Sequence, residues 1–120
     1  MGKAEGYVEN YLVKKCEDNG IYCRKHVTPG RRGAPDRLVI FRGKTIFIET
    51  KSKDGRPSEL QKREIGRMLN SGADVRIYYL REQVDAFIEE LLALPEIDVI
   101  IPDYMKGFLK PKCLPISKSS

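Results

Sequence analysis

The chain has 120 residues, the length of one compact domain, and its 41% hydrophobic content is sufficient for a packed core. With 22 Lys plus Arg against 17 Asp plus Glu, the net charge of +5 favours a polyanionic partner. No apolar run is long enough to cross a bilayer and no signal-peptide core follows Met1, so we expect neither membrane insertion nor secretion. The three scattered cysteines (Cys16, Cys23 and Cys113) do not resemble a disulfide framework and favour a reducing, cytoplasmic location.

The positive charge is concentrated in the middle of the chain. Between Arg24 and Arg67 there are thirteen Lys or Arg and five Asp or Glu, whereas the rest of the chain has nine and twelve. A charged run of this kind is usually just a solvated surface. Because the basic segment also holds the most distinctive motif of the sequence, it is equally consistent with a nucleic-acid partner.

The first half of the chain reads as a helix followed by short strands. Apolar residues at helical spacing, ending before Gly20, predict a helix over residues 3–19. Residues 21–27 favour a strand, and the two prolines and two glycines of residues 28–35 indicate a loop. Residues 37–41 and 44–50 predict two strands, joined by Arg42 and Gly43 in a two-residue hairpin turn.

The second half alternates helix and strand. A loop over residues 53–57 precedes a predicted helix over 58–70, a strand over 75–80 and a helix over 82–94. The apolar side of that last helix consists of Val84, Phe87, Ile88, Leu91 and Leu92. The order α-β-β-β-α-β-α predicts a single α/β domain, a mixed central sheet flanked by helices. We expect that domain to occupy residues 1–94, and residues 95–120 to form a C-terminal extension whose last residues are disordered.

The predicted hairpin places two carboxylates opposite each other. With Arg42 and Gly43 as turn residues, Asp36 faces Glu49, and directly opposed Cβ atoms are about 4.5–5.5 Å apart. Lys51 lies two residues beyond Glu49 and therefore on the same face of the strand. Two like charges repel each other at this distance, so stability alone does not explain the pair. A turn of another length would shift the register and separate these side chains.

Adjacent carboxylates are typical of sites for Mg²⁺ or Mn²⁺, and a nearby ammonium can orient water for metal-assisted phosphodiester hydrolysis. The alternative is that Glu49 and Lys51 decorate an exposed sheet face, since Glu-x-Lys by itself is a common pattern. The register with Asp36 is the more specific signal.

Two helical residues extend this candidate site. Glu5 falls on the apolar side of the first predicted helix and Glu9 at its edge; a carboxylate there requires a partner, although fraying of the terminus would remove the need. Gln61 shares a helix face with Ile65, and Ser58-x-x-Gln61 also predicts a capping box. Both roles of Gln61 are compatible.

Three segments together resemble a VRR-NUC domain, a branch of the PD-(D/E)xK nuclease superfamily. They are the loop from Gly30 through Pro35-Asp36-Arg37, the strand ending Ile48-Glu49-Thr50-Lys51, and Ser58-Glu59-Leu60-Gln61. The resemblance covers about residues 3–80. It implies a restriction-endonuclease-like αβββαβ core and a nuclease that uses Mg²⁺ or Mn²⁺ to cleave DNA, leaving 5′-phosphate ends.

The resemblance also implies residue roles. Asp36 and Glu49 match the metal-binding acids, Lys51 the catalytic lysine, and the carbonyl of Thr50 a further metal ligand. Glu5 best matches the helix glutamate, with Glu9 as the alternative, and Gln61 matches the glutamine of the following helix. Short stand-alone members are often encoded by phages, are similar to archaeal resolvases, dimerise and act on four-way (Holliday) junctions.

The favoured hypothesis is therefore a metal-dependent, structure-selective DNA endonuclease that acts as a homodimer on branched DNA, with flap or general DNA cleavage as alternatives. The cationic side chains expected to bind the DNA backbone are Arg31, Arg32, Arg37, Lys53 and Lys62. A second hypothesis is a non-catalytic DNA-binding protein, which leaves the carboxylate pair without a purpose. A third is a zinc site made by the three cysteines and His26, whose spacing matches no usual zinc finger.

Overall fold

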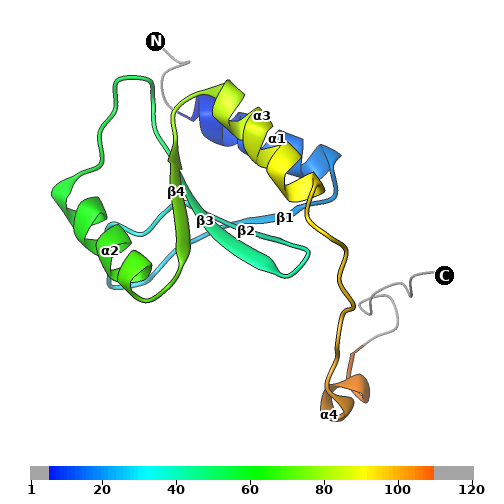
Figure 1. The fold of residues 1–120 in the computed structure, drawn as a ribbon. Helices are drawn as coiled ribbons and strands as arrows, with labels where there is room; N and C mark the ends of the chain where they lie inside the picture. The colour runs from blue at the N-terminus through cyan, green and yellow to red at the C-terminus, as the bar shows by residue number, and fades with distance from the viewer. Residues whose placement is uncertain (1–5, 110–120) are drawn as a thin grey trace.

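The fold was obtained as a computed structural model that describes residues 6–109 (Figure 1). Three long helices and four strands form the body, and a fourth, short helix lies beyond it. In chain order the elements are α1 (Tyr7–Asp18), β1 (Tyr22–Lys25), β2 (Arg37–Phe41), β3 (Lys44–Thr50), α2 (Glu59–Asn70), β4 (Asp74–Tyr78), α3 (Arg81–Leu92) and α4 (Asp103–Lys106). This order confirms the predicted α/β fold and its αβββαβ core.

The sheet is mixed, with the strands in the order β1-β2-β3-β4. The β1–β2 and β2–β3 pairs are antiparallel, whereas β3 and β4 are parallel and are connected through α2. Such a parallel crossover through a helix is the usual βαβ connection. Because β3 is a central strand, residues at its C-terminal end are bordered by β2 on one side and β4 on the other.

The β2–β3 turn has the geometry that the sequence predicts. Arg42 and Gly43 both have positive φ angles, 46° and 82°, as a two-residue type I′ turn requires. Arg42 is held in this unusual conformation by its own side chain, whose Nη1 donates to the carbonyl oxygens of Leu92 (3.1 Å) and Leu94 (2.7 Å) at the end of α3. The turn fixes the register, in which Phe41 pairs with Lys44 and Arg37 with Ile48.

The core lies between the sheet and the α1–α3 pair, which covers one face of it (Figure 1). Alternation along β3 directs Ile46 and Ile48 into this core and leaves Phe47 and Glu49 on the other face. The buried helix residues are Val8, Leu12 and Cys16 of α1 and Val84, Phe87, Ile88 and Leu91 of α3. Burying seven such side chains supplies much of the driving force for folding.

Helix α2 covers the opposite face of the sheet, beside β4 (Figure 1). The predicted capping box is present: Ser58 Oγ accepts from the Gln61 N–H at 3.1 Å and Gln61 Oε1 accepts from the Ser58 N–H at 2.9 Å. The loop over residues 28–35, which contains Arg31 and Arg32, packs closely against the first turn of α2. Gly33 has φ +96°, and a Cβ at that position would collide with the carbonyl of Leu60.

Several predicted boundaries differ from those observed. In the described part of the chain the first helix begins at Tyr7, after Gly6, and the predicted helical residues 3–5 fall outside the described range. The strands predicted over 21–27 and 75–80 are shorter or shifted, and the helix predicted over 82–94 spans Arg81–Leu92. Leu92 is 41% exposed, so its place in the apolar side of that helix was predicted wrongly. The expected disorder of the last residues concerns positions outside the described range.

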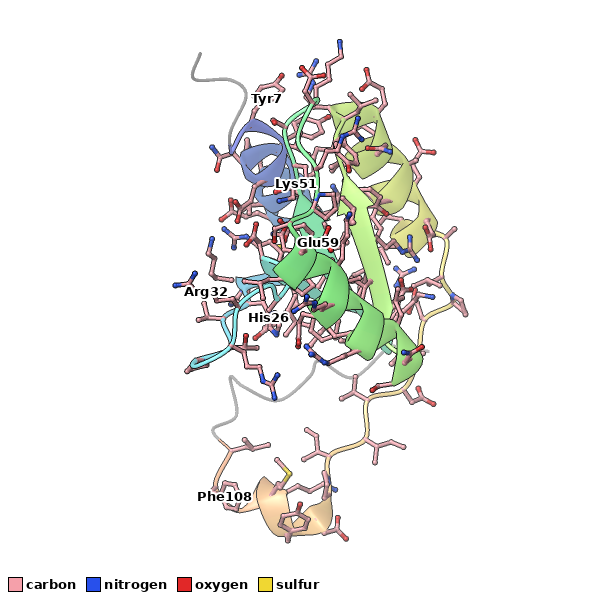
Figure 2. The ribbon with its side chains drawn as sticks, turned by 90° about the vertical axis from the view of Figure 1, so that its left-hand side faces the viewer. Tyr7, His26, Arg32, Lys51, Glu59 and Phe108 are labelled. Carbon is pink, nitrogen blue, oxygen red and sulfur yellow. The ribbon has the colours of Figure 1, made fainter. Side chains whose placement is uncertain are left out.

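The segment after Pro95 contains α4, which the sequence pattern did not indicate. Several of its large apolar side chains are exposed, among them Ile100 (86%), Tyr104 (77%) and Phe108 (70%), and Figure 2 shows Phe108 far from the sheet. Within residues 6–109, no helix combines the length and apolar character needed to cross a membrane.

Candidate active site

Two carboxylates meet where the β2–β3 hairpin ends. The observed register pairs Arg37 with Ile48, so the next residues outward, Asp36 and Glu49, stand opposite each other. The main chain at Asp36 is held by His26, the residue that follows β1, because the Asp36 carbonyl oxygen accepts from the His26 N–H at 2.7 Å. Asp36 and Glu49 both line a cavity of about 330 Å³. The hairpin therefore delivers both acids to one hollow of the surface.

Glu49 is the most unusual residue of this cavity. Its exposure is only 2%, and its Oε2 accepts from Gln61 Nε2 at 2.9 Å and lies 3.4 Å from Lys51 Nζ. Its Oε1 is also buried but has no hydrogen-bond partner in the described part of the chain. Leaving a buried oxygen without a donor costs about 1–3 kcal/mol, more when it is charged. That oxygen is thus free to bind a positively charged group.

The environment disfavours negative charge on both acids. Burial raises the pKa of Glu49, and the neighbouring Asp36 carboxylate raises it further, against the opposing attraction of Lys51. Burial also raises the pKa of Asp36, followed by repulsion from Glu9. Carboxyl groups whose pKa values are raised by burial and by like charges in a cleft are typical of functional sites.

Lys51 is held beside these acids by both its backbone and its side chain. Its N–H donates to the Tyr78 carbonyl at 2.9 Å, which continues the β3–β4 pairing, and its Nζ lies 3.4 Å from Glu49 Oε2. Figure 2 shows Lys51 between the beginnings of α1 and α2. An ammonium in this position adjoins both the acid pair and the open mouth of the cavity.

Gln61 connects α2 to the site. Its Oε1 completes the capping box while its Nε2 donates to Glu49 Oε2, so one amide serves both purposes that the sequence suggested. Because the cap fixes the amide, it also fixes the orientation of the Glu49 carboxylate. The partnerless Oε1 of Glu49 is therefore held in a defined place.

Glu9 lines the same cavity but has cationic partners of its own. Its Oε2 accepts from Arg37 Nε at 2.8 Å and lies 3.4 Å from Lys25 Nζ. Arg37, one of the residues expected to bind DNA, is thus already engaged by α1. Glu5, the other candidate helix glutamate, lies outside the described residues.

The donor set fits a small divalent cation. Within residues 6–109, no three His, Cys, Asp or Glu side chains are grouped so as to hold a metal by themselves. Mg²⁺ does not require such a cage, since it commonly uses one or two protein carboxylates together with water and substrate phosphate. Asp36, the partnerless Oε1 of Glu49 and the cavity-lining Thr50 provide oxygen donors of this kind.

The residues of the alternative zinc hypothesis have other surroundings. Cys16 and Cys23 are buried in the hydrophobic core, and Cys113 lies outside the described range. The Nδ1 atom of His26 lies 2.8 Å from the Pro35 carbonyl oxygen, and its ring packs edge-on to Phe47.

Comparison with known proteins identifies relatives of this arrangement, although no protein-family model matches the chain. "Putative nuclease p44" of Acyrthosiphon pisum secondary endosymbiont phage 1 is 42% identical over 72 residues, which are 59% of this chain and 77% of that protein. A solved structure described as a VRR_NUC domain is 40% identical and superposes with a TM-score of 0.65, covering 72% of this chain and 95% of that one. The chain belongs to the VRR-NUC nuclease family.

In this VRR-NUC nuclease, one cavity is lined by four of the predicted site residues, Asp36, Glu49, Thr50 and Lys51, and also by Glu9, the alternative helix glutamate. Most of the residues expected to contact DNA are exposed. Arg31, Arg32 and Lys53 are exposed on loops, and Lys62 is exposed on α2 with an ion pair to Glu59 at 3.1 Å. Figure 2 shows Arg32 projecting outward from its loop.

The sequence did not indicate that the loop after β3 forms part of the VRR-NUC cavity. Ser52, Gly55 and Arg56 line it together with the acids. The sequence showed that this loop contains basic and turn-forming residues. It did not show where the loop runs, because the path of a loop cannot be obtained from hydrophobic periodicity.

Proposed function

We propose that this VRR-NUC nuclease is a DNA endonuclease that requires Mg²⁺ or Mn²⁺ and leaves 5′-phosphate ends. The observation that carries the proposal is the buried, partnerless Oε1 of Glu49 beside Asp36, with the Lys51 ammonium next to them. A non-catalytic protein that used its cationic surface only to bind DNA would gain nothing from two desolvated acids.

Each residue then has a distinct role. Asp36, Glu49 and the carbonyl of Thr50 would hold the metal, which when bound acidifies water and neutralises charge on the phosphate. Lys51, held next to Glu49, donates a hydrogen bond to the attacking water or to a phosphate oxygen. Gln61 keeps the Glu49 carboxylate in place through its 2.9 Å hydrogen bond. Glu9, or Glu5, completes the acidic side of the site.

The proposed substrate is branched DNA, with the four-way junction first and flaps or plain duplex as alternatives. Exposed Arg31, Arg32, Lys53 and Lys62 are suited to contact backbone phosphates, which position DNA without reading its sequence. The body is small, with the whole described chain extending 47 × 30 × 23 Å, so a symmetric homodimer would engage two arms of a junction. The phage origin of the relative supports action in the cytoplasm of a bacterial host.

A cleavage panel tests the proposal. Labelled single strand, duplex, 5′ and 3′ flaps and a four-way junction would each be incubated with Mg²⁺, Mn²⁺ or EDTA. Asp36→Asn and Lys51→Ala should abolish cleavage while DNA binding persists, whereas Asp54→Asn, in the exposed loop nearby, should cleave like wild type.

Paired symmetric nicks on the junction that disappear in EDTA would support the resolvase proposal, and light scattering of the complex should then give a dimer. Cleavage confined to flaps or duplex would support the proposed nuclease activity and overturn the four-way junction as the proposed substrate. The absence of any metal-dependent product would overturn the proposed activity and favour simple DNA binding.

A further inference from the structure

Arg56 lines the same cavity as the two acids but has no assigned role. It comes from the loop between β3 and α2, and its side chain is exposed. Nowhere in the described range does it form a hydrogen bond or an ion pair, although Glu9, Asp36 and Glu49 line the cavity with it. A cation that borders an acidic cavity yet has no carboxylate partner is available to another anion.

The backbone around Arg56 is more constrained than its exposure suggests. The Gly55 N–H donates to the Ser52 carbonyl at 2.9 Å and closes a turn directly before it. A Cβ at Gly55 would come within 3.1 Å of Ser52 Oγ, so this turn is tight. Pro57 follows and restricts Arg56 to extended backbone, and Ser58 then caps α2. The backbone of Arg56 is therefore anchored between a closed turn and a capped helix.

Three of the four other charged side chains of the cavity are already paired. Glu9 accepts from Arg37 and Lys25, and Lys51 is paired with Glu49. Among the side chains that line the cavity, Arg56 and Lys51 are the two cations beside three carboxylates, so Arg56 offsets negative charge that a phosphodiester would otherwise meet. A guanidinium also offers two parallel donors that match two phosphate oxygens, which an ammonium does not.

We propose that Arg56 is a positioning residue that binds the non-bridging oxygens of the phosphate to be cut and directs that phosphate between the acid pair and Lys51. This inference rests on the proposed endonuclease function. It predicts that Arg56 acts on the substrate, so its loss should change DNA binding and catalysis while leaving the fold unaffected.

Kinetics of Arg56→Ala and Arg56→Lys give the first test, with Arg24→Ala as a charge-matched control. Arg24 stacks on Tyr22 and lines a separate cavity with Glu17, near the other end of α1. We expect kcat/KM to fall about 100-fold in Arg56→Ala and about tenfold in Arg56→Lys, because the ammonium retains charge but loses the two-pronged geometry. Arg24→Ala should stay within twofold of wild type, and all melting temperatures should agree.

Binding in EDTA gives a readout that does not depend on catalysis. For duplex arms, the slope of log affinity against log salt should fall by about 0.9 in Arg56→Ala, the loss of one phosphate contact. A methylphosphonate at the mapped cut position should weaken wild-type binding about tenfold and Arg56→Ala binding hardly at all, since the contact is already lost.

The outcomes separate the two proposals. Wild-type cleavage with an unchanged Arg56→Ala variant, or an equal methylphosphonate effect in both proteins, would overturn the role of Arg56 and leave the endonuclease intact. If wild type gives no metal-dependent product, the endonuclease proposal fails, and the role of Arg56 fails with it because no phosphate is cut.

Discussion

Neutralising one of the paired acids should make the protein more stable while making it inactive. In Asp36→Asn, the amide has nearly the shape of the carboxylate but removes one of two opposed charges. The pKa of Asp36 is raised by burial and by Glu9, and that of Glu49 by burial and by Asp36, so both acids are costly to ionise in the folded state. The substitution removes part of that cost.

The magnitude follows from the hairpin geometry. Two unit charges about 5 Å apart repel by roughly 3 kcal/mol at an effective dielectric constant of 20. The variant also loses the attraction of Asp36 to Lys25, Lys51 and Arg37, which lowers the gain. We expect a net stabilisation of about 1 kcal/mol in EDTA, equivalent to a rise in Tm of about 4–8 °C for a domain of this size.

Thermal unfolding followed by circular dichroism at neutral pH measures this difference. Asp54→Asn removes an equal charge from an exposed loop and should not change Tm. Adding Mg²⁺ should stabilise wild type by about 1.4 kcal/mol at ten times its Kd, and Asp36→Asn by less. An Asp36→Asn protein that melts at or below the wild-type temperature in EDTA would refute the reasoning.

Three further substitutions test the scaffold. Arg76 lowers the pKa values of Asp74 and Glu90, so Arg76→Met should lower the free energy of unfolding by about 1 kcal/mol at pH 7. This loss should shrink at low pH, where both carboxyls are protonated and wild type no longer gains from the ion pairs. Melting curves at pH 7 and pH 3 measure the difference. Gly33→Ala should cost at least about 2 kcal/mol in urea unfolding because its Cβ meets the first turn of α2. Arg42→Ala should cost about 1–2 kcal/mol in the same assay, through two lost hydrogen bonds to the end of α3.

The first two of these substitutions have a direct contradicting result. A pH-independent deficit in Arg76→Met would mean that its ion pairs do not account for its contribution. Wild-type stability in Gly33→Ala would show that the loop is not held against α2. An Arg42→Gly variant provides the control for the turn, since glycine relieves the positive φ and isolates the loss of the side-chain hydrogen bonds.

The central hairpin was predictable because local chemistry determines it. Arg42-Gly43 between two apolar runs specifies a two-residue turn, and a turn of that length specifies which residues face each other. The capping box at Ser58 and Gln61 was equally local. From these two features the sequence predicted that Asp36 opposes Glu49 and that Gln61 caps the following helix, whereas the link of Gln61 to the site came from the family resemblance.

Contacts between distant segments could not be obtained in the same way. The engagement of Glu9 by Arg37 joins residues 28 positions apart, and helical periodicity placed Glu9 only at an edge. Arg56 reaches the cavity through the path of a loop, which has no periodicity. The four-residue helix α4 is too short to produce a recognisable apolar pattern.

The two-residue turn between β2 and β3 also disfavours incorrect pairing of these strands. A slip of one residue in the pairing would transfer Glu49 to the face covered by α1 and α3, among apolar side chains and away from Asp36. Burying an unpaired carboxylate there is costly, so the slipped register is disfavoured. The same turn therefore sets both the alignment of the sheet and the meeting of Asp36 with Glu49, and we expect a lengthened turn to separate the two acids.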